Sequence, residues 1–80
     1  MFFFYVLRSE RNGKYYTGHA EDLKVRLVKH NSGAVPSTRS GRPWRLVYHE
    51  SFEMRADAMK RESEIKRKKK RSYIEQLIPR

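Results

Sequence analysis

The chain has 80 residues, enough for one domain with a single modest core. It contains no cysteine, which excludes disulfides and thiolate zinc sites. Lysine and arginine total 19 against 9 aspartate and glutamate residues, and the resulting charge of +10 favours a polyanionic partner such as nucleic acid. Charge alone leaves two alternatives open, a basic membrane-surface protein and a basic ribosomal or chromatin-type packing protein.

The first part of the chain predicts two antiparallel strands. Residues 2–7 are apolar on both alternating faces, which is typical of a central strand covered on both sides. Asn12-Gly13 predicts a type I′ hairpin turn into a second strand at residues 14–18. The apolar run is too short to span a bilayer and lacks a basic leader, so we expect a cytoplasmic protein without membrane contact.

A helix is expected next. Asp22 can cap its first turn, apolar residues recur at helical spacing, and Gly33 supplies a left-handed stop. Arg26 and His30 are four residues apart. They are expected at the edge of the apolar stripe, from which both side chains would reach over the sheet.

Residues 32–43 are rich in Gly, Ser, Arg and Pro and show no period, so they predict a long loop that is functional or mobile. The alternation of apolar and polar side chains over residues 44–52 predicts a third strand with one buried face.

A second helix begins near Met54, and its expected apolar face contains Ala58, Met59, Glu62 and Ile65. A carboxylate on such a face needs a partner, and a metal ion is one that suffices. The basic run at residues 66–71 leads to a last short helix that ends before Pro79.

These elements predict a single domain over residues 1–80, with a three-stranded, mostly antiparallel sheet flanked by helices in the order β-β-α-β-α-α. The fold class is α/β in the loose sense and α+β in the strict one.

Four groups of residues follow the order and spacing of the GIY-YIG nuclease superfamily, and the resemblance covers nearly the whole chain: Phe3-Phe4-Tyr5, Tyr16-Thr17-Gly18, Arg26 with His30-Asn31, and Glu62. Within it, residues 22–27 and 42–48 resemble small stand-alone bacterial proteins of the UPF0213 type, and the second stretch, with Ser37-Thr38-Arg39 before it, is the more specific. The first motif departs from the family pattern, because aromatic residues replace its glycine and isoleucine.

The resemblance implies a phosphodiesterase site with one divalent cation, Mg²⁺ or Mn²⁺. By motif position the catalytic residues are Tyr5, Tyr16, Arg26 and His30, and the metal ligand is Glu62.

General chemistry agrees with this assignment. Hydrolysis of a phosphodiester needs a base, a Lewis acid and positive charge at the transition state. A tyrosine is a weak base, with a reference pKa of about 10, but a nearby cation can help it. The fork of Arg26 suits a phosphate, and a single carboxylate such as Glu62 suits Mg²⁺, which retains several waters. Which tyrosine is the base stays open, and metal-bound water is the expected general acid.

Ordinary explanations exist for each residue. The tyrosines could be strand aromatics, Arg26 a solvated helix residue and His30 a helix C-terminal cation. Glu62 could be satisfied by a salt bridge to Arg26, or its carboxylate could snorkel to solvent. His19 and His49 carry no argument for a site.

The sequence therefore predicts a metal-dependent endonuclease that hydrolyses phosphodiester bonds, in DNA repair or processing. The alternative is a non-catalytic nucleic-acid-binding protein with the same fold, and a purely structural role comes third. DNA is favoured over RNA as partner, and a monomer is expected. The expected contacts to nucleic acid are Arg39, Arg42, Arg45, Lys66, Lys68, Lys69 and Lys70.

Overall fold

The computed structural model describes residues 1–68 and 70–79, so the predicted contact at Lys69 lies outside the described residues. Its elements are β1 (Phe2–Ser9), β2 (Tyr15–Ala20), α1 (Leu23–Ser32), a 3₁₀ turn η1 (Arg39–Gly41), β3 (Trp44–Phe52), α2 (Arg55–Lys68) and α3 (Arg71–Leu77). This order confirms the predicted α+β arrangement. The sheet is antiparallel throughout, with strand order β2-β1-β3.

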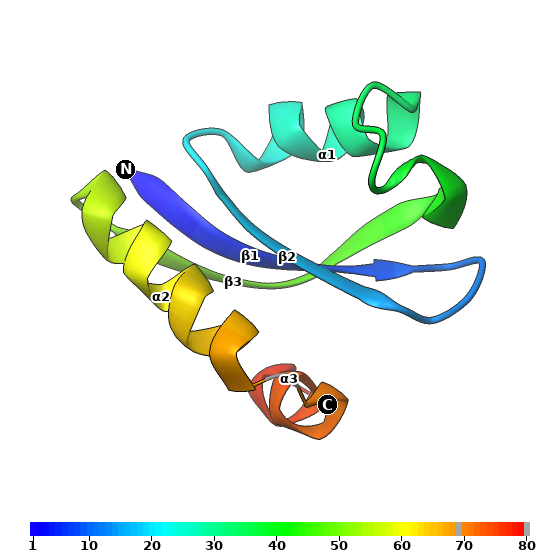
Figure 1. Cartoon of the computed structure of the whole chain (residues 1–80). Coiled ribbons are helices and arrows are strands. Elements are labelled where there is room, and N and C mark those ends of the chain that lie inside the picture. The colour runs from blue at the N-terminus through cyan, green and yellow to red at the C-terminus, as the bar shows by residue number, and fades with distance from the viewer. Residues whose placement is uncertain (69, 80) are drawn as a thin grey trace.

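The central strand β1 explains the layering of the molecule. Helix α1 covers one face of the sheet, whereas α2 and α3 cover the other (Figure 1). Tyr5 and Leu7 belong to the core cluster under α1, and Phe4 and Val6 belong to the cluster under α2 and α3. Strand β1 is apolar on both faces because each face is covered by a helical layer.

The turn between β1 and β2 differs from the predicted type I′ hairpin. The connection spans residues 10–14, and it carries a left-handed residue at Gly13, with φ of +75°. The Gly13 N–H donates to Ser9 O at 2.9 Å, and the Ser9 hydroxyl accepts the N–H groups of Arg11 and Asn12 at 3.1 Å. The Ser9 side chain thus stabilises a longer loop than the Asn-Gly pair predicted.

Helix α1 begins and ends as expected. The Val25 N–H donates to the Asp22 carboxylate at 3.0 Å, and Gly33 ends the helix with φ of +85°. The expected position of His30 at the edge of the stripe was wrong, because its side chain is buried with 1% exposure. His30 is buried between α1 and the sheet, where its Nε2 lies 2.9 Å from the Tyr5 hydroxyl.

The predicted long loop at residues 32–43 is organised around Thr38 and η1. Thr38 is buried with 1% exposure, and its carbonyl accepts the Trp44 indole N–H at 2.7 Å. The Trp44 ring packs directly over Gly41, where a Cβ atom would clash with it. The sequence of this segment has no period and so did not predict these contacts. Side-chain and tertiary hydrogen bonds hold the segment, instead of the backbone pattern of a helix or strand.

Strand β3 has the predicted bounds, but its side chains join the core on both faces of the sheet and not on one. A bulge opposite Val6 and Leu7 shifts the register, so that Tyr48 pairs with Val6 and Leu46 pairs with Leu7. Trp44 and Leu46 therefore join the core under α1, whereas Tyr48 joins the core under α2 and α3.

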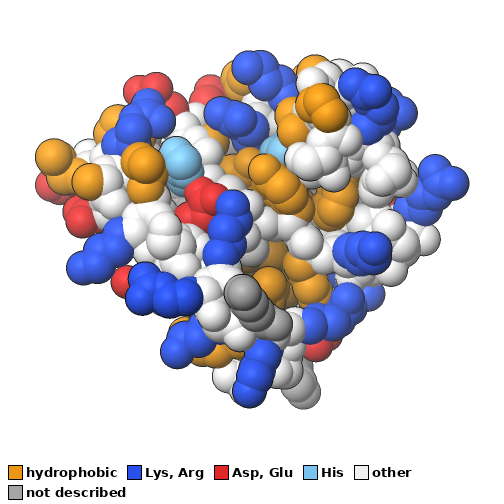
Figure 2. All heavy atoms as spheres, in the orientation of Figure 1, with side chains coloured by type: hydrophobic (Ala, Val, Ile, Leu, Met, Phe, Trp, Pro, Cys, Tyr) orange, Lys and Arg blue, Asp and Glu red, His pale blue; other side chains and the backbone are white. Residues whose placement is uncertain are grey.

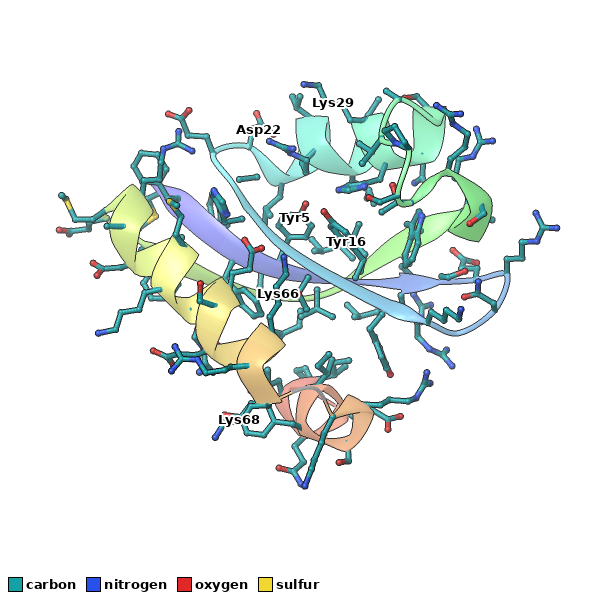
Figure 3. All side chains as sticks on the ribbon, in the orientation of Figure 1. Tyr5, Tyr16, Asp22, Lys29, Lys66 and Lys68 are labelled. Carbon is teal, nitrogen blue, oxygen red and sulfur yellow. The ribbon has the colours of Figure 1, made fainter. Side chains whose placement is uncertain are left out.

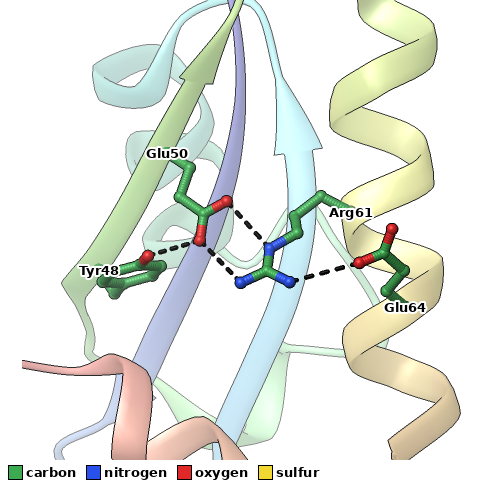
Figure 4. Close-up of polar contacts among 4 residues, drawn as sticks. All are labelled: Tyr48, Glu50, Arg61 and Glu64. Carbon is green, nitrogen blue, oxygen red and sulfur yellow. Dashed lines mark hydrogen bonds and ion pairs between the residues drawn. The ribbon is translucent and has the colours of Figure 1, made fainter.

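Helix α2 buries Ala58 and Ile65 as predicted, but Met59 is 46% exposed, so its placement on the buried face was wrong. A polar network fixes the helix against β3 (Figure 4). Arg61 donates to both carboxylate oxygens of Glu50 at 3.0 and 3.1 Å and to Glu64 at 3.4 Å, while the Tyr48 hydroxyl donates to Glu50 at 2.5 Å.

This network sets the electrostatics of the β3 contact. Burial alone would raise the Glu50 pKa, but hydrogen bonds from Arg61 and Tyr48 outweigh it and hold the pKa below its ordinary value. Helix α3 adds Tyr73, Ile74 and Leu77 to the core beside it. Within the described parts of the chain, we find no helix with the length and apolar character needed to cross a membrane.

Candidate functional site

A neutral hydrogen-bonded chain forms the α1 side of the candidate site. The Tyr5 hydroxyl lies 2.9 Å from His30 Nε2, and His30 Nδ1 lies 2.8 Å from Thr38 Oγ1. The Thr38 hydroxyl donates to the Val35 carbonyl at 3.3 Å, so it accepts from His30. His30 therefore carries its proton on Nδ1, and its Nε2 accepts the Tyr5 hydroxyl proton.

The pKa shifts agree with this proton arrangement. Burial, and then the charge of Arg26, lower the His30 pKa, so the imidazole is neutral at pH 7. Burial raises the Tyr5 pKa, and the charges of Tyr16 and Glu62 add to the increase, whereas Arg26 opposes it. The Tyr5 hydroxyl thus lies within electrostatic reach of three of the other predicted site residues.

Tyr16 is the more accessible phenol. Its ring lies 4.9 Å from the His30 ring and 6.3 Å from the Trp44 ring, measured between centroids. Tyr5 is 2% exposed, whereas Tyr16 is only half-buried. Both side chains point into the space between β2 and α1 (Figure 3). A solvent molecule or substrate at this position meets Tyr16 before Tyr5.

Gly18, the last residue of the motif Tyr16-Thr17-Gly18, leaves room for the Tyr5 side chain. It pairs with Tyr5 across β1 and β2, and a Cβ atom at Gly18 would lie 2.6 Å from the Tyr5 hydroxyl oxygen. Any side chain here would displace that hydroxyl from His30. The glycine is therefore needed for the approach of Tyr5 and not for a turn.

The charged side of the candidate site is centred on Glu62. Its carboxylate accepts from His19 Nδ1 at 2.6 Å and pairs with Lys66 Nζ at 2.5 Å. Burial would raise the Glu62 pKa, but the hydrogen bonds and charges of Lys66 and His19 hold it below the ordinary value, so Glu62 is anionic at pH 7. Glu62 keeps a side-chain exposure of 16%.

The partners of Glu62 differ from the salt bridge to Arg26 that the sequence offered as an ordinary explanation. Its partners are Lys66 and His19, and no ion pair joins it to Arg26 among the residues that the structure describes. His19, which the sequence left without a role, is one of these partners. Strand alternation places His19 opposite Phe4 on the α2 side of the sheet, but only the packing of α2 on β2 brings it to Glu62.

The chemistry of the groups around Glu62 limits the kind of metal ion that this carboxylate could hold. A carboxylate has about four lone-pair sites, and His19 and Lys66 use two of them. Among the described residues, no group of three or more His, Asp and Glu side chains is arranged to hold a metal. The donor set therefore fits a hard cation that keeps most of its waters, such as Mg²⁺, and not a zinc ion.

The expected nucleic-acid contacts fall into two groups. Arg39, Arg42 and Arg45 are all exposed; the first two donate to the carbonyls of Gly33 and Arg39, each at 2.9 Å. In the basic run, Lys70 is exposed, Lys68 lies 5.3 Å from the Tyr73 ring centroid, and Lys66 pairs with Glu62. Lys66 is thus part of the candidate site as well as of the basic surface.

Comparison with known proteins gives a consistent assignment. The family model of the GIY-YIG catalytic domain matches residues 1–75. A UPF0213 protein of Bacillus pumilus is 44% identical over 79 residues, which cover 94% of this chain and 80% of that protein. A UPF0213 protein of Staphylococcus saprophyticus is 42% identical over 65 residues, which cover 80% of this chain and 78% of that protein.

A solved structure agrees with these sequence relatives. The solution NMR structure of a UPF0213 protein from Bacillus halodurans matches with a TM-score of 0.58 and 37% identity, covering 96% of this chain and 82% of that one. The chain therefore belongs to the GIY-YIG family, a superfamily of nucleases, and within it to the UPF0213 proteins.

Proposed function

We propose that this protein is a metal-dependent endonuclease that hydrolyses phosphodiester bonds in nucleic acid, with DNA as the first candidate. One observation carries the proposal: the Tyr5 hydroxyl, held by His30, lies within the electrostatic reach of Arg26, Tyr16 and Glu62. Two phenols, a cation and a carboxylate that are far apart in the sequence therefore include three groups whose charges act on the ionisation of the Tyr5 hydroxyl. Perturbed ionisable groups gathered in this way are typical of catalytic sites.

Arg26 has the role of stabilising the transition state. Its guanidinium is half-buried on α1, and its charge acts on both Tyr5 and His30. A phosphodiester gains negative charge on its oxygens during hydrolysis, and a planar fork of donors matches that charge. Arg26 stays protonated, so it binds and orients the phosphate and transfers no proton.

Tyr16 has the role of contacting the attacking water, because it is the accessible phenol. Tyr5, His30 and Thr38 form the wall behind it and keep the Tyr16 ring in place through the His30 ring. They are positioning residues in this mechanism. As a general base Tyr16 would act as the phenolate, after its own hydroxyl proton has passed to solvent, and it would then take the proton of the attacking water.

Glu62 would hold a divalent cation, Mg²⁺ or Mn²⁺, through the lone pairs that His19 and Lys66 leave free. When bound, such a cation supplies Lewis-acid charge at a phosphate oxygen. His19 and Lys66 keep the carboxylate ionised and fix its position through their contacts at 2.6 and 2.5 Å.

A second function has its own supporting observation. Glu62 already has two cationic or hydrogen-bonding partners, so its burial is explained without a metal. With a net charge of +10, the chain could bind nucleic acid and leave it uncut.

One experiment separates the two functions. Purified protein is incubated with single-stranded, duplex and branched DNA and RNA in Mg²⁺, in Mn²⁺ and in EDTA, and the products are resolved on denaturing gels. The nuclease proposal expects cleavage in metal and none in EDTA. Binding to the same substrates without cleavage in either metal would support the binding function instead.

A further inference from the structure

A groove lies on the α2 side of β2 and shares Lys66 with the candidate site. It has a volume of about 360 Å³. The space-filling view shows an apolar hollow on this face with Lys and Arg side chains around it (Figure 2). The lining residues are Lys14, Tyr15, Thr17, Ile65, Lys66, Lys70, Arg71 and Ile74.

The lining has two chemical parts. Lys14, Lys66, Lys70 and Arg71 supply four positive charges, whereas Ile65, Ile74 and the Tyr15 ring supply an apolar surface. Arg71 is fixed at the groove, because it lies 4.7 Å from the Tyr15 ring centroid and donates to the Gly13 carbonyl at 2.9 Å. Cations next to an aromatic side chain match a nucleotide, whose phosphate is anionic and whose base has a flat face that stacks on aromatic rings.

The groove is continuous with the candidate site. Lys66 lines the groove and also contacts Glu62. Tyr15 and Thr17 line it from β2, on either side of Tyr16 in the sequence. A nucleic-acid strand whose phosphate lies at Arg26 and Tyr16 would therefore meet the groove after crossing β2. This β-strand lies at an edge of the sheet.

We propose that this groove binds the nucleic-acid strand on one side of the scissile phosphate, with Lys14, Lys70 and Arg71 contacting its phosphates. This inference rests on the proposed function, and it assigns binding roles to Lys14 and Arg71, which lie outside the predicted contacts. It also divides the basic run: Lys70 lines the groove, whereas Lys68 lies over the Tyr73 ring.

Binding without cleavage tests the groove independently of the nuclease proposal. The Glu62→Gln protein in EDTA is titrated with fluorescent 12-nucleotide DNA and RNA strands at several salt concentrations. Added Lys14→Gln/Lys70→Gln substitutions should lower the log–log salt slope by about 0.7 for each lost contact to a single strand. The control is Lys60→Gln, which removes one charge from an exposed position of α2 that does not line the groove, and should change the slope less per charge.

Each outcome has a distinct meaning. A larger loss per charge at Lys14 and Lys70 than at Lys60 supports the groove, and the more tightly bound of the two strands identifies DNA or RNA as its ligand. Equal losses per charge, or no binding of either strand at low salt, overturn the proposal. If the wild-type protein cleaves nucleic acid in Mg²⁺ while the losses are equal, the groove proposal fails and the proposed function stands.

Discussion

The two sides of β2 hold the candidate site by different means. On the α1 side, Tyr5, His30 and Thr38 are neutral, almost fully buried and joined by hydrogen bonds. On the α2 side, Glu62 and Lys66 form a charged pair, with side-chain exposures of 16% and 55%.

This difference in burial and charge gives the two sides different roles. A buried hydroxyl or imidazole that loses its partner has no water to replace it, so the α1 side is fixed in one arrangement. A partly exposed ion pair contributes little stability and can exchange its partners for a substrate or a cation. We infer that the α1 side positions the reacting groups and that the α2 side supplies the exchangeable charge.

Arg26 gives the largest expected effect among the substitutions on the α1 side, because it brings charge to an otherwise neutral layer. Arg26→Ala should lower the cleavage rate by about 10²–10³-fold, and Arg26→Lys should restore little because an ammonium lacks the fork. Steady-state cleavage of a fluorescent oligonucleotide measures the rate. Full activity in Arg26→Lys would remove the fork from the mechanism.

The two tyrosines test the division between contact and positioning. Tyr16→Phe should lower the cleavage rate by about 10²-fold, because it removes the accessible hydroxyl. Tyr5→Phe should retain more activity and instead lower the free energy of unfolding by about 1 kcal/mol, because it leaves His30 Nε2 without its donor. Cleavage rates and urea denaturation of both variants decide this. A greater rate loss in Tyr5→Phe would make Tyr5 the base.

On the α2 side, Arg61 holds helix α2 against β3 through its two hydrogen bonds to Glu50. Arg61→Met should lower the free energy of unfolding by about 1–3 kcal/mol, because it leaves the half-buried Glu50 carboxylate without its bidentate partner. The control is Arg55→Met, whose pair with Glu21 is exposed and should contribute less than about 1 kcal/mol. Equal losses in urea denaturation would contradict a special role for the Arg61 network.

His30 gives the smallest expected effect, a pH dependence of stability. Its pKa is lowered in the folded chain, so below its ordinary value of about 6.5 the unfolded chain binds a proton that the folded chain resists. The free energy of unfolding should therefore fall between pH 7 and 5.5, by at most about 1.4 kcal/mol per pH unit from this group. Urea denaturation of wild type and His30→Gln measures it, and an identical pH dependence would contradict the buried neutral imidazole.

The elements of the fold followed from local sequence features, but several contacts did not. Asp22 and Gly33 predicted the ends of α1 because capping is local. The Asn12-Gly13 pair did not reveal the role of Ser9, whose hydroxyl also donates to the distant Gly41 carbonyl at 2.6 Å. Alternation in β3 did not reveal the bulge, because the bulge depends on the pairing with β1. Met59 was wrongly placed on the buried face, because a helical period predicts where the apolar stripe lies but not how wide it is.

The candidate site was predicted as a set of residues and not as an arrangement. Tyr5, Tyr16, Arg26, His30 and Glu62 came from the family motifs. Thr38 lies in a stretch that resembles the subfamily, but its role could not be found in this way, and neither could that of His19, because both depend on hydrogen bonds formed only in the fold. Lys66 was expected as a phosphate contact, and its i to i+4 spacing from Glu62 was the local feature that indicated their pairing.

The most direct test compares two carboxylates on the same helix, α2. Glu62 faces the candidate site, whereas Glu64 pairs with Arg61. Wild type, Glu62→Gln and Glu64→Gln are assayed for cleavage of the same DNA in saturating Mg²⁺ and Mn²⁺, with circular dichroism as the check on folding. A metal-dependent nuclease site at Glu62 predicts that Glu62→Gln folds and leaves the DNA uncut, while Glu64→Gln cleaves like wild type. Wild-type cleavage by Glu62→Gln would contradict it.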